Sequence, residues 1–132
     1  MRVNLSNSSL QNRYFQEQEE VIQMSGMNEH LLNFKGLMID EVQRVIIREN
    51  QEIELTYTEF EILKLFAKHP GIVFSKEQIY DIVWKESYSG DYNIVMSHIR
   101  NIREKIEDNP SKPSYIQTVW GVGYRFNKNL IA

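Results

Sequence analysis

The chain has no cysteine among its 132 residues. This absence excludes a disulfide framework, a zinc site built on thiolates and a cysteine nucleophile. No apolar run approaches the roughly 18 residues that a membrane-spanning helix needs, and the first residues lack the apolar stretch of a secretory signal. We therefore expect a cytoplasmic protein with no membrane partner, whose 42% hydrophobic and 25% charged residues suit one globular domain.

The chain also lacks an excess of positive charge, because its 15 Lys and Arg are outnumbered by 18 Asp and Glu, which gives a formal net charge of −3. This total argues weakly against a nucleic-acid binder, but its distribution argues the other way. Residues 1–92 hold nine Lys or Arg and fifteen Asp or Glu, whereas residues 93–132 hold six and three. Since DNA responds to the local field of a surface, the last forty residues are the expected footprint, with few phosphate contacts.

The groups that usually carry catalysis are missing as well. The sequence has no glycine loop of the kind that cradles phosphates, and no nucleophile–base pair. His30 and His69 have no second ligand at metal-binding spacing, so structural roles are expected for both. The acidic residues of the helical region are interpreted as caps and surface charges; they are Glu59, Glu61, Glu77, Asp81 and Glu104. We expect no enzyme activity, no metal and no cofactor.

Two segments are predicted, with a boundary near residue 28. Residues 1–28 are interpreted as a leader or linker, disordered or forming a short amphipathic helix, and Ser25-Gly26 interrupts any helix there. Residues 29–132 are the predicted domain. It begins with four short aliphatic runs, LLNF, LMID, RVII and EIEL, separated by Gly, Asn and charged residues. This pattern predicts an antiparallel sheet of about four strands.

Two helices follow, each with a predicted capping box, at Thr58–Glu61 and at Ser75–Gln78. Residues 69–71 (HPG) end the first helix, and residues 72–74 form a short strand. The residues predicted to face inward are Phe60, Leu63, Phe66 and Ala67 on the first helix and Ile79, Ile82 and Val83 on the second, with Trp84 as a core residue or loop anchor.

The segment 93–108, NIVMSHIRNIREKIED, is predicted to be a third, amphipathic helix capped by Asp91 or Asn93. Its core stripe is Val95, Ile99, Ile102 and Ile106, and its other face carries Asn93, Met96, Ser97, Arg100, Asn101 and Arg103. Amides, a hydroxyl and guanidinium groups can bind base edges and phosphates in a major groove, which admits a helix. A solvated surface helix would look the same, so the helix alone leaves both interpretations open.

The residues after this helix favour DNA binding. Residues 115–119 and 124–126 are β-branched and aromatic and flank Gly121 and Gly123, which predicts a hairpin. Its inner face is expected to carry Tyr124 and Phe126, while Arg125 is either solvated or faces a phosphate. Three helices followed by a hairpin define a winged helix-turn-helix, so the predicted fold class is α+β with an N-terminal sheet, three helices and a C-terminal wing.

Three motifs in order, TEFEIL, HIRNIREKI and TVWGVGYRF, resemble the effector domain of OmpR/PhoB-type two-component response regulators, and TVWGVGY is most similar to the VanR-like subgroup. The resemblance covers about residues 31–126. It implies sequence-specific binding of double-stranded DNA by a transcriptional regulator, with the third helix in the major groove and the wing on the adjacent backbone or minor groove. A winged helix that binds protein instead of DNA is the alternative.

The resemblance implies base-facing positions for Asn93, Ser97 and Asn101, and phosphate or groove contacts for His98, Arg100 and Arg103. The whole expected DNA-binding set is Asn93, Met96, Ser97, His98, Arg100, Asn101, Arg103, Thr118, Trp120, Gly121, Tyr124 and Arg125. The loop that would contact RNA polymerase is Lys85, Glu86, Ser87, Tyr88, Ser89, Gly90, Asp91 and Tyr92. Head-to-tail self-association on direct repeats is also implied.

The chain departs from many members of this family at three positions, where Asn93, Asn101 and Trp120 replace arginine. An indole cannot read the negative potential of a minor groove, so Trp120 is expected to stack on sugar or pack under the wing. Asparagine favours a bidentate contact to adenine, which predicts some A·T content in the DNA site.

The family's receiver domain would need on the order of a hundred further residues upstream. About thirty precede the resemblance here, so we expect either an excised effector domain or a regulator without a receiver.

Overall fold

The computed structural model describes residues 30–85 and 91–131. The predicted leader over residues 1–28 and most of the predicted polymerase-contact loop therefore lie outside the described residues. The chain divides into two compact units, the first ending at Glu54 and the second comprising Leu55–Ile131.

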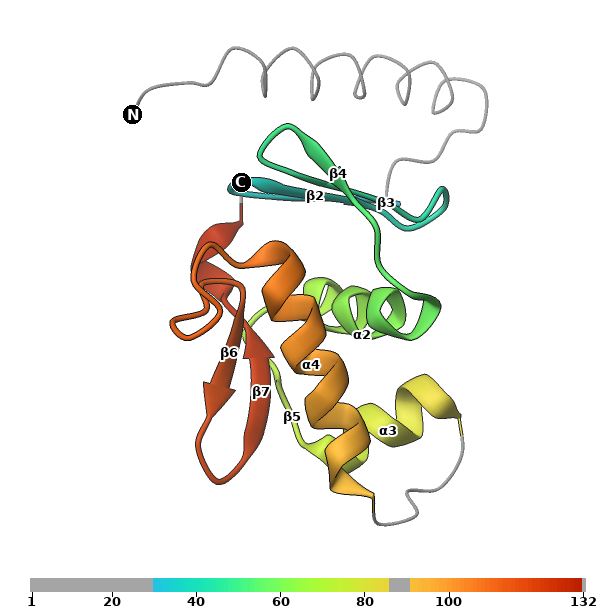
Figure 1. The fold of residues 1–132 in the computed structure, drawn as a ribbon, viewed down its shortest axis with the longest axis vertical. Helices are drawn as coiled ribbons and strands as arrows, with labels where there is room; N and C mark the ends of the chain where they lie inside the picture. Colours follow the sequence, from blue (N-terminus) through green and yellow to red (C-terminus); the bar gives the residue numbers. More distant parts are fainter. Residues whose placement is uncertain (1–29, 86–90, 132) are drawn as a thin grey trace. The chain divides into compact units, whose positions relative to one another are not determined.

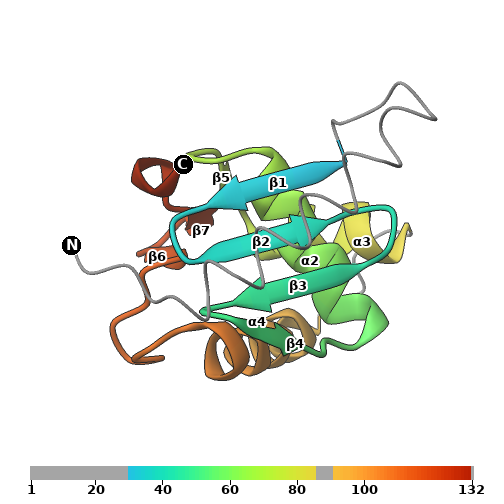
Figure 2. The same ribbon diagram turned by 90° about the horizontal axis from the view of Figure 1, so that it is seen from above.

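The first unit is a four-stranded antiparallel sheet in the order β1-β2-β3-β4 (Figure 2). Its strands are β1 Leu31–Phe34, β2 Leu37–Asp40, β3 Val45–Arg48 and β4 Gln51–Ile53. Two-residue connections join the first and last pairs, with positive φ at Gly36 (76°), Glu49 (47°) and Asn50 (69°), as tight hairpins require. The predicted sheet is confirmed, and its last two strands are shifted by one or two residues from the expected runs.

The second unit contains three helices and a three-stranded sheet in the order β5-β7-β6 (Figure 1). The elements are α2 Tyr57–Lys68, β5 Val73–Phe74, α3 Lys76–Trp84, α4 Tyr92–Ile106, β6 Ile116–Val119, β7 Gly123–Phe126 and the short 3-10 helix η1 Lys128–Leu130. The three predicted helices, the short strand and the C-terminal hairpin are all confirmed. Phe60, Leu63, Phe66 and Ala67 of α2 are buried as expected.

The capping box of α2 lies two residues before the predicted one. Thr56 is the N-cap: its Oγ1 accepts from the Glu59 N–H (3.2 Å), and Glu59 Oε1 accepts from the Thr56 N–H (3.0 Å). The prediction at Thr58–Glu61 was wrong because two overlapping Thr-x-x-Glu patterns occur here, and an N-cap must have extended backbone, which Thr56 adopts (ψ 165°). The predicted box Ser75–Gln78 of α3 is confirmed.

Ile82 of α3 is 48% exposed, although it was expected to face inward. Ile79 is buried as expected, and Tyr80, which was not among the residues expected to face inward, is buried as well. Successive residues of an α-helix are turned by about 100°, so a face centred between Ile79 and Tyr80 carries the half-buried Val83 and leaves Ile82 on the solvent side. The sequence pattern alone fits either rotation of this short helix.

Candidate nucleic-acid interface

Helix α4 has one buried and one exposed face. Asp91 caps it by accepting from the Asn93 N–H (3.1 Å). The predicted core stripe is confirmed, because Val95, Ile99, Ile102 and Ile106 are each at most 2% exposed. The opposite face, with exposed Asn93, Met96, Ser97, Arg100 and Asn101, is open to solvent. The amides of Asn93 and Asn101 and the guanidinium of Arg100, all predicted to contact DNA, are therefore accessible from outside.

His98 sits at the border of this face and is half-buried. Its ring lies 5.6 Å from that of Trp84 at the end of α3, and Trp84 stacks on Tyr80 at 4.8 Å. These ring contacts join α3 to α4, and Trp84 is half-buried among them. Nδ1 of His98 is buried without a hydrogen-bond partner among the described residues. Of the two ring nitrogens, Nε2 is therefore the one that could contact a partner.

Arg103, at the far end of the polar face, is half-buried and contacts the hairpin. Its Nε and Nη2 donate to the Ile116 carbonyl (3.2 and 2.9 Å), and Nη2 also donates to Thr118 Oγ1 (2.8 Å). Its guanidinium carbon lies 5.5 Å from the centroid of the Tyr124 ring. Burial lowers the pKa of Arg103, and the nearby Tyr124 and Glu107 oppose that shift. Arg103 therefore braces β6 against α4 as a cation.

Glu107 is a second brace, which the sequence interpretation missed. This C-cap residue of α4 is 7% exposed, and its carboxylate accepts from the N–H groups of Ser114 (2.6 Å), Tyr115 (3.0 Å) and Ile116 (2.9 Å). A carboxylate that accepts several backbone N–H groups forms strong, charge-assisted hydrogen bonds. Glu107 and Arg103 together fix where β6 begins relative to α4. A glutamate at a helix end is common, so no sequence signal identified this role.

The hairpin between β6 and β7 is closed by a tight turn. The Val122 N–H donates to the Val119 carbonyl (2.9 Å), and Gly121 has φ +79° at the third position, where a type II turn requires positive φ. Gly123 allows β7 to approach β5, since a Cβ there would lie 2.1 Å from the Phe74 carbonyl oxygen. Trp120 is 89% exposed, so it does not pack under the wing, which was one of its two predicted positions.

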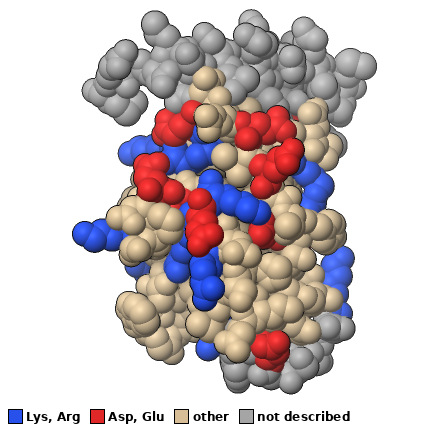
Figure 3. All heavy atoms as spheres, viewed as in Figure 1, with Lys and Arg blue, Asp and Glu red and all other residues tan. Residues whose placement is uncertain are grey.

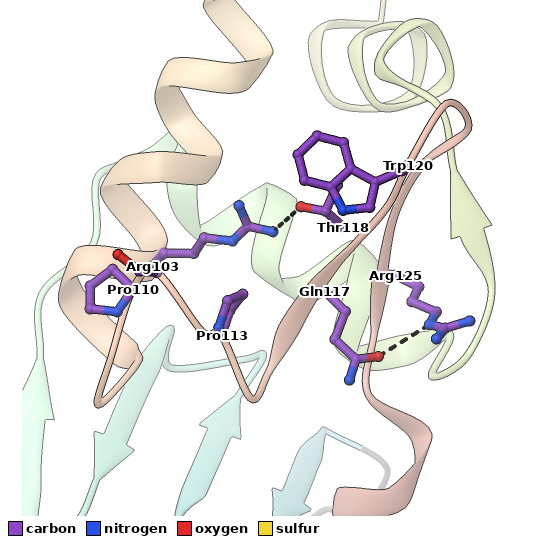
Figure 4. A pocket seen from close by; sticks show the side chains of 8 residues that line it. Arg103, Pro110, Pro113, Gln117, Thr118, Trp120 and Arg125 are labelled. Atoms are coloured by element: carbon purple, nitrogen blue, oxygen red, sulfur yellow. Dashed lines mark hydrogen bonds between the residues drawn. The ribbon is translucent and has the colours of Figure 1, made fainter.

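Two hollows flank the hairpin. One, of about 420 Å³, lies between the hairpin tip, the start of α3 and α4, and Lys76, Met96, Trp120 and Val122 are among its lining residues. The other, of about 530 Å³, lies between the hairpin and the end of α4 (Figure 4). Arg103 and Arg125 contribute to this second hollow, and the Arg125 Nε donates to Gln117 Oε1 (3.1 Å).

The surface over α4 and the hairpin in Figure 3 is mostly uncharged, with a few Lys and Arg and a few Asp and Glu side chains. Within the described residues, no three His, Cys, Asp or Glu side chains are grouped to hold a metal ion. No helix in residues 30–85 or 91–131 combines the length and apolar character needed to cross a membrane.

A helix with a free polar face, held by a second helix and followed by a braced hairpin, defines the winged helix-turn-helix class. Residues 50–126 match the family described as "Transcriptional regulatory protein, C terminal". The chain therefore belongs to this family of transcriptional regulator domains, and its relatives place it in the OmpR/PhoB type.

Two curated relatives illustrate the match. The chain is 48% identical over 98 residues to the transcriptional regulatory protein YcbL of Bacillus subtilis, covering 74% of this chain and 43% of YcbL. It is 43% identical over 93 residues to the regulatory protein VanRc of Enterococcus gallinarum, covering 70% of this chain and 40% of VanRc. The chain thus spans less than half the length of these curated relatives.

Two solved structures share the fold. The response regulator DrrB of Thermotoga maritima, an OmpR/PhoB homologue, matches with a TM-score of 0.69 and 34% identity, over 80% of this chain and 48% of DrrB. The DNA-binding domain of RstA from Klebsiella pneumoniae, solved in complex with the RstA box, matches with a TM-score of 0.69 and 28% identity, over 74% of this chain and 96% of that domain.

Proposed function

We propose that this chain binds double-stranded DNA in a sequence-specific manner, as the DNA-binding domain of a two-component transcriptional regulator. The observation that carries the proposal is the division of α4, whose four aliphatic residues are buried while Asn93, Ser97, Arg100 and Asn101 are exposed beside the hairpin. A major groove of B-DNA is wide enough for such a helix. The solved complex of the RstA domain with the RstA box supports the same use of the fold.

The side chains of this surface divide into two groups by what they can bind. Asn93, Ser97 and Asn101 are short, neutral and exposed, which suits hydrogen bonds to base edges. Arg100 and His98 suit phosphates. The remaining members of the proposed DNA surface are Met96, Arg103, Thr118, Trp120, Gly121, Tyr124 and Arg125. Arg103 has a second role in this proposal, because its bonds to Ile116 and Thr118 leave Nη1 for a phosphate.

Two further partners belong to the proposal. Residues 85–92, which lie between α3 and α4 in the sequence and include the first residue of α4, are the proposed contact with RNA polymerase, as the family resemblance implies. Two copies are proposed to bind direct repeats head to tail. Their contact would be heterologous, meaning that each copy uses a different surface.

The proposal is tested by selecting bound fragments from a random-sequence duplex library with the whole chain, and then measuring the affinity of a recovered duplex against salt. We expect a shared, partly A·T-containing motif and a linear fall of log K with log salt, because each neutralised phosphate releases counterions. Failure to enrich any motif, together with affinity that does not respond to salt, would instead favour a winged helix that binds protein.

A further inference from the structure

The N-terminal sheet is buried on both of its faces at the centre. Side chains of a strand alternate between the two faces of a sheet, so Leu37 and Ile39 of β2 lie on one face and Met38 lies on the other. Ile47 of β3 pairs with Met38 and shares its face. All four side chains are at most 3% exposed within a single copy of the chain. An antiparallel sheet commonly leaves one face in water, and residues 30–54 form only the strands and their connections, so each face of this sheet needs a cover from elsewhere in the chain.

The face that carries Met38 is a narrow apolar strip, which we call the Met38 face. The strand register places on it Leu31, Asn33, Met38, Asp40, Val45, Ile47 and Glu52. Leu31 and Val45 flank the buried centre and are half-buried, whereas Asn33 and Glu52 on the two edge strands are exposed. An apolar centre between polar edges is the shape that the apolar stripe of a single amphipathic helix covers.

Residues 10–24, LQNRYFQEQEEVIQM, carry the matching sequence pattern. Leu10, Tyr14, Val21 and Met24 are spaced by four, seven and three residues, which places them on one side of a helix. A helix over this segment has a length of about 22 Å. The outermost of four strands lie about 14 Å apart, at about 4.8 Å per strand. One helix of this length therefore crosses the whole sheet.

The connection to β1 is short and long enough. Residues 25–29, SGMNE, join the segment to the sheet, and Ser25-Gly26 ends a helix there. Five residues extend to about 17 Å, which lets the segment turn back over the strand that follows it. Closing so short a loop costs little entropy, and a contact within one chain avoids the cost of association. A second copy would instead need about 800 Å² of each partner, far more than the centre formed by Met38 and Ile47.

We propose that residues 10–24 form an amphipathic helix that docks on the Met38 face of the same chain, with Leu10, Tyr14 and Val21 against Met38 and Ile47. The segment before the sheet is then a built-in cover for an apolar surface rather than a free leader. Without it, the Met38 face is an exposed apolar patch of the kind that attracts other proteins. This inference does not depend on the proposed DNA binding, so the two can fail separately.

The test uses the absence of cysteine from the chain. Met38→Cys introduces a single thiol on the Met38 face, and Leu37→Cys introduces one on the opposite face; both sites are at most 1% exposed, and cysteine packs as a small apolar residue. The rate of thiol modification by a neutral maleimide is measured for each in the whole chain, with and without Val21→Asp. Because a buried thiol reacts only after local opening, Val21→Asp should speed the reaction of Met38→Cys by at least about tenfold and leave that of Leu37→Cys unchanged.

Gln23→Asp is the matched control for Val21→Asp. It adds the same charge two residues away, about 200° around the helix from Val21 and therefore on its polar side. Valine and aspartate have similar helix propensities, so Val21→Asp removes the apolar contact without a large change in helix formation. Gln23→Asp should leave the reaction of Met38→Cys unchanged.

Hydrogen exchange on the chain without cysteine gives a second measurement. An isolated helix of this length is marginal in water, so slow exchange of the amides of residues 10–24, lost in Val21→Asp, would support docking. The inference is overturned if these amides exchange fast in the wild type, or if the Met38→Cys thiol stays protected in Val21→Asp. It is equally overturned if Val21→Asp or Gln23→Asp exposes the Met38→Cys and Leu37→Cys thiols alike. Protection of Met38→Cys that is lost on dilution would show that a second copy covers the face, which also contradicts docking within one chain.

Discussion

At the scale of single residues, Arg100 and Asn101 separate affinity from specificity. Both are exposed neighbours on α4, yet a guanidinium neutralises phosphate while an amide pairs with a base edge. Arg100→Ala should weaken binding to all sequences similarly and reduce the salt slope by about 0.9. Asn101→Ala should change the preferred base at one position, worth roughly 1–3 kcal/mol of discrimination. Competition binding with single-base variants of the selected duplex measures both effects, and identical behaviour of the two variants would contradict this division.

At the scale of elements, the packing of β7 on β5 depends on Gly123. Gly123→Ala places a Cβ 2.1 Å from the Phe74 carbonyl oxygen, so the two strands must separate. Gly121→Ala is the matched control: open space surrounds its Cβ, and the cost is that of φ +79°, roughly 1–2 kcal/mol. Urea unfolding should show a clearly larger loss of unfolding free energy for Gly123→Ala. Equal losses would mean that β5 does not pair closely with β7.

The link between α2 and α4 should respond to acid. Glu59, whose side chain is 3% exposed, lies 2.6 Å from the Lys105 ammonium. Burial raises the pKa of Glu59, but the hydrogen bonds from Lys105 and Thr56 and the charge of Lys105 outweigh burial, so its pKa lies below the usual 4.5. Because the folded pKa is lower than the unfolded one, the stabilisation is present above about pH 4.5 and is lost as pH falls through the folded pKa.

Glu59→Gln should therefore lower the free energy of unfolding at pH 7 by roughly 1.5–3 kcal/mol, and the difference from wild type should shrink below about pH 4.5. Glu61→Gln is the control, since the Glu61–Lys64 pair at 3.2 Å lies within one helix and the Glu61 side chain is more exposed than that of Glu59; its loss should be a few tenths of a kcal/mol. Thermal or urea unfolding at several pH values gives the comparison. A Glu59→Gln effect that stays constant to pH 3 would show that the carboxylate charge is not the cause.

At the scale of the whole molecule, the formal net charge is −3, and only residues 93–132 carry a small positive excess, with six Lys or Arg against three Asp or Glu. Few phosphate contacts are therefore available to one copy. Affinity should then depend on a second copy bound beside the first. A duplex with two selected sites as direct repeats, about one helical turn apart, should bind the second copy more tightly than a duplex with one site. The same sites as inverted repeats should give no such gain, because a head-to-tail contact has one direction along the duplex. Equal gains in gel-shift titrations would contradict the head-to-tail arrangement.

The order and type of the elements followed from the sequence because local physics dictates them. Aliphatic residues four, three and four apart identify α4, and all four are buried. Short aliphatic runs between Gly and Asn residues identify the sheet of the first unit. Ser75 and Gln78 cap α3 through contacts three residues apart. Each of these signals lies within a few residues of the chain, so no knowledge of the distant packing was needed.

The tertiary structure decided what depends on contacts between elements. Whether Thr56 or Thr58 caps α2, and whether Ile82 or Tyr80 faces inward, depends on how each helix is rotated against its neighbours. Arg103 shares the polar side of α4 with Arg100, but its hydrogen bonds to Ile116 and Thr118 form because the hairpin folds back beside the helix. Exposure of Trp120 likewise follows from the turn at Gly121. Periodicity along the chain therefore identified the buried face of the long helix α4 but not that of the short helix α3, and the packing of distant segments determined the rotation of α3 and which groups of α4 remain available to a partner.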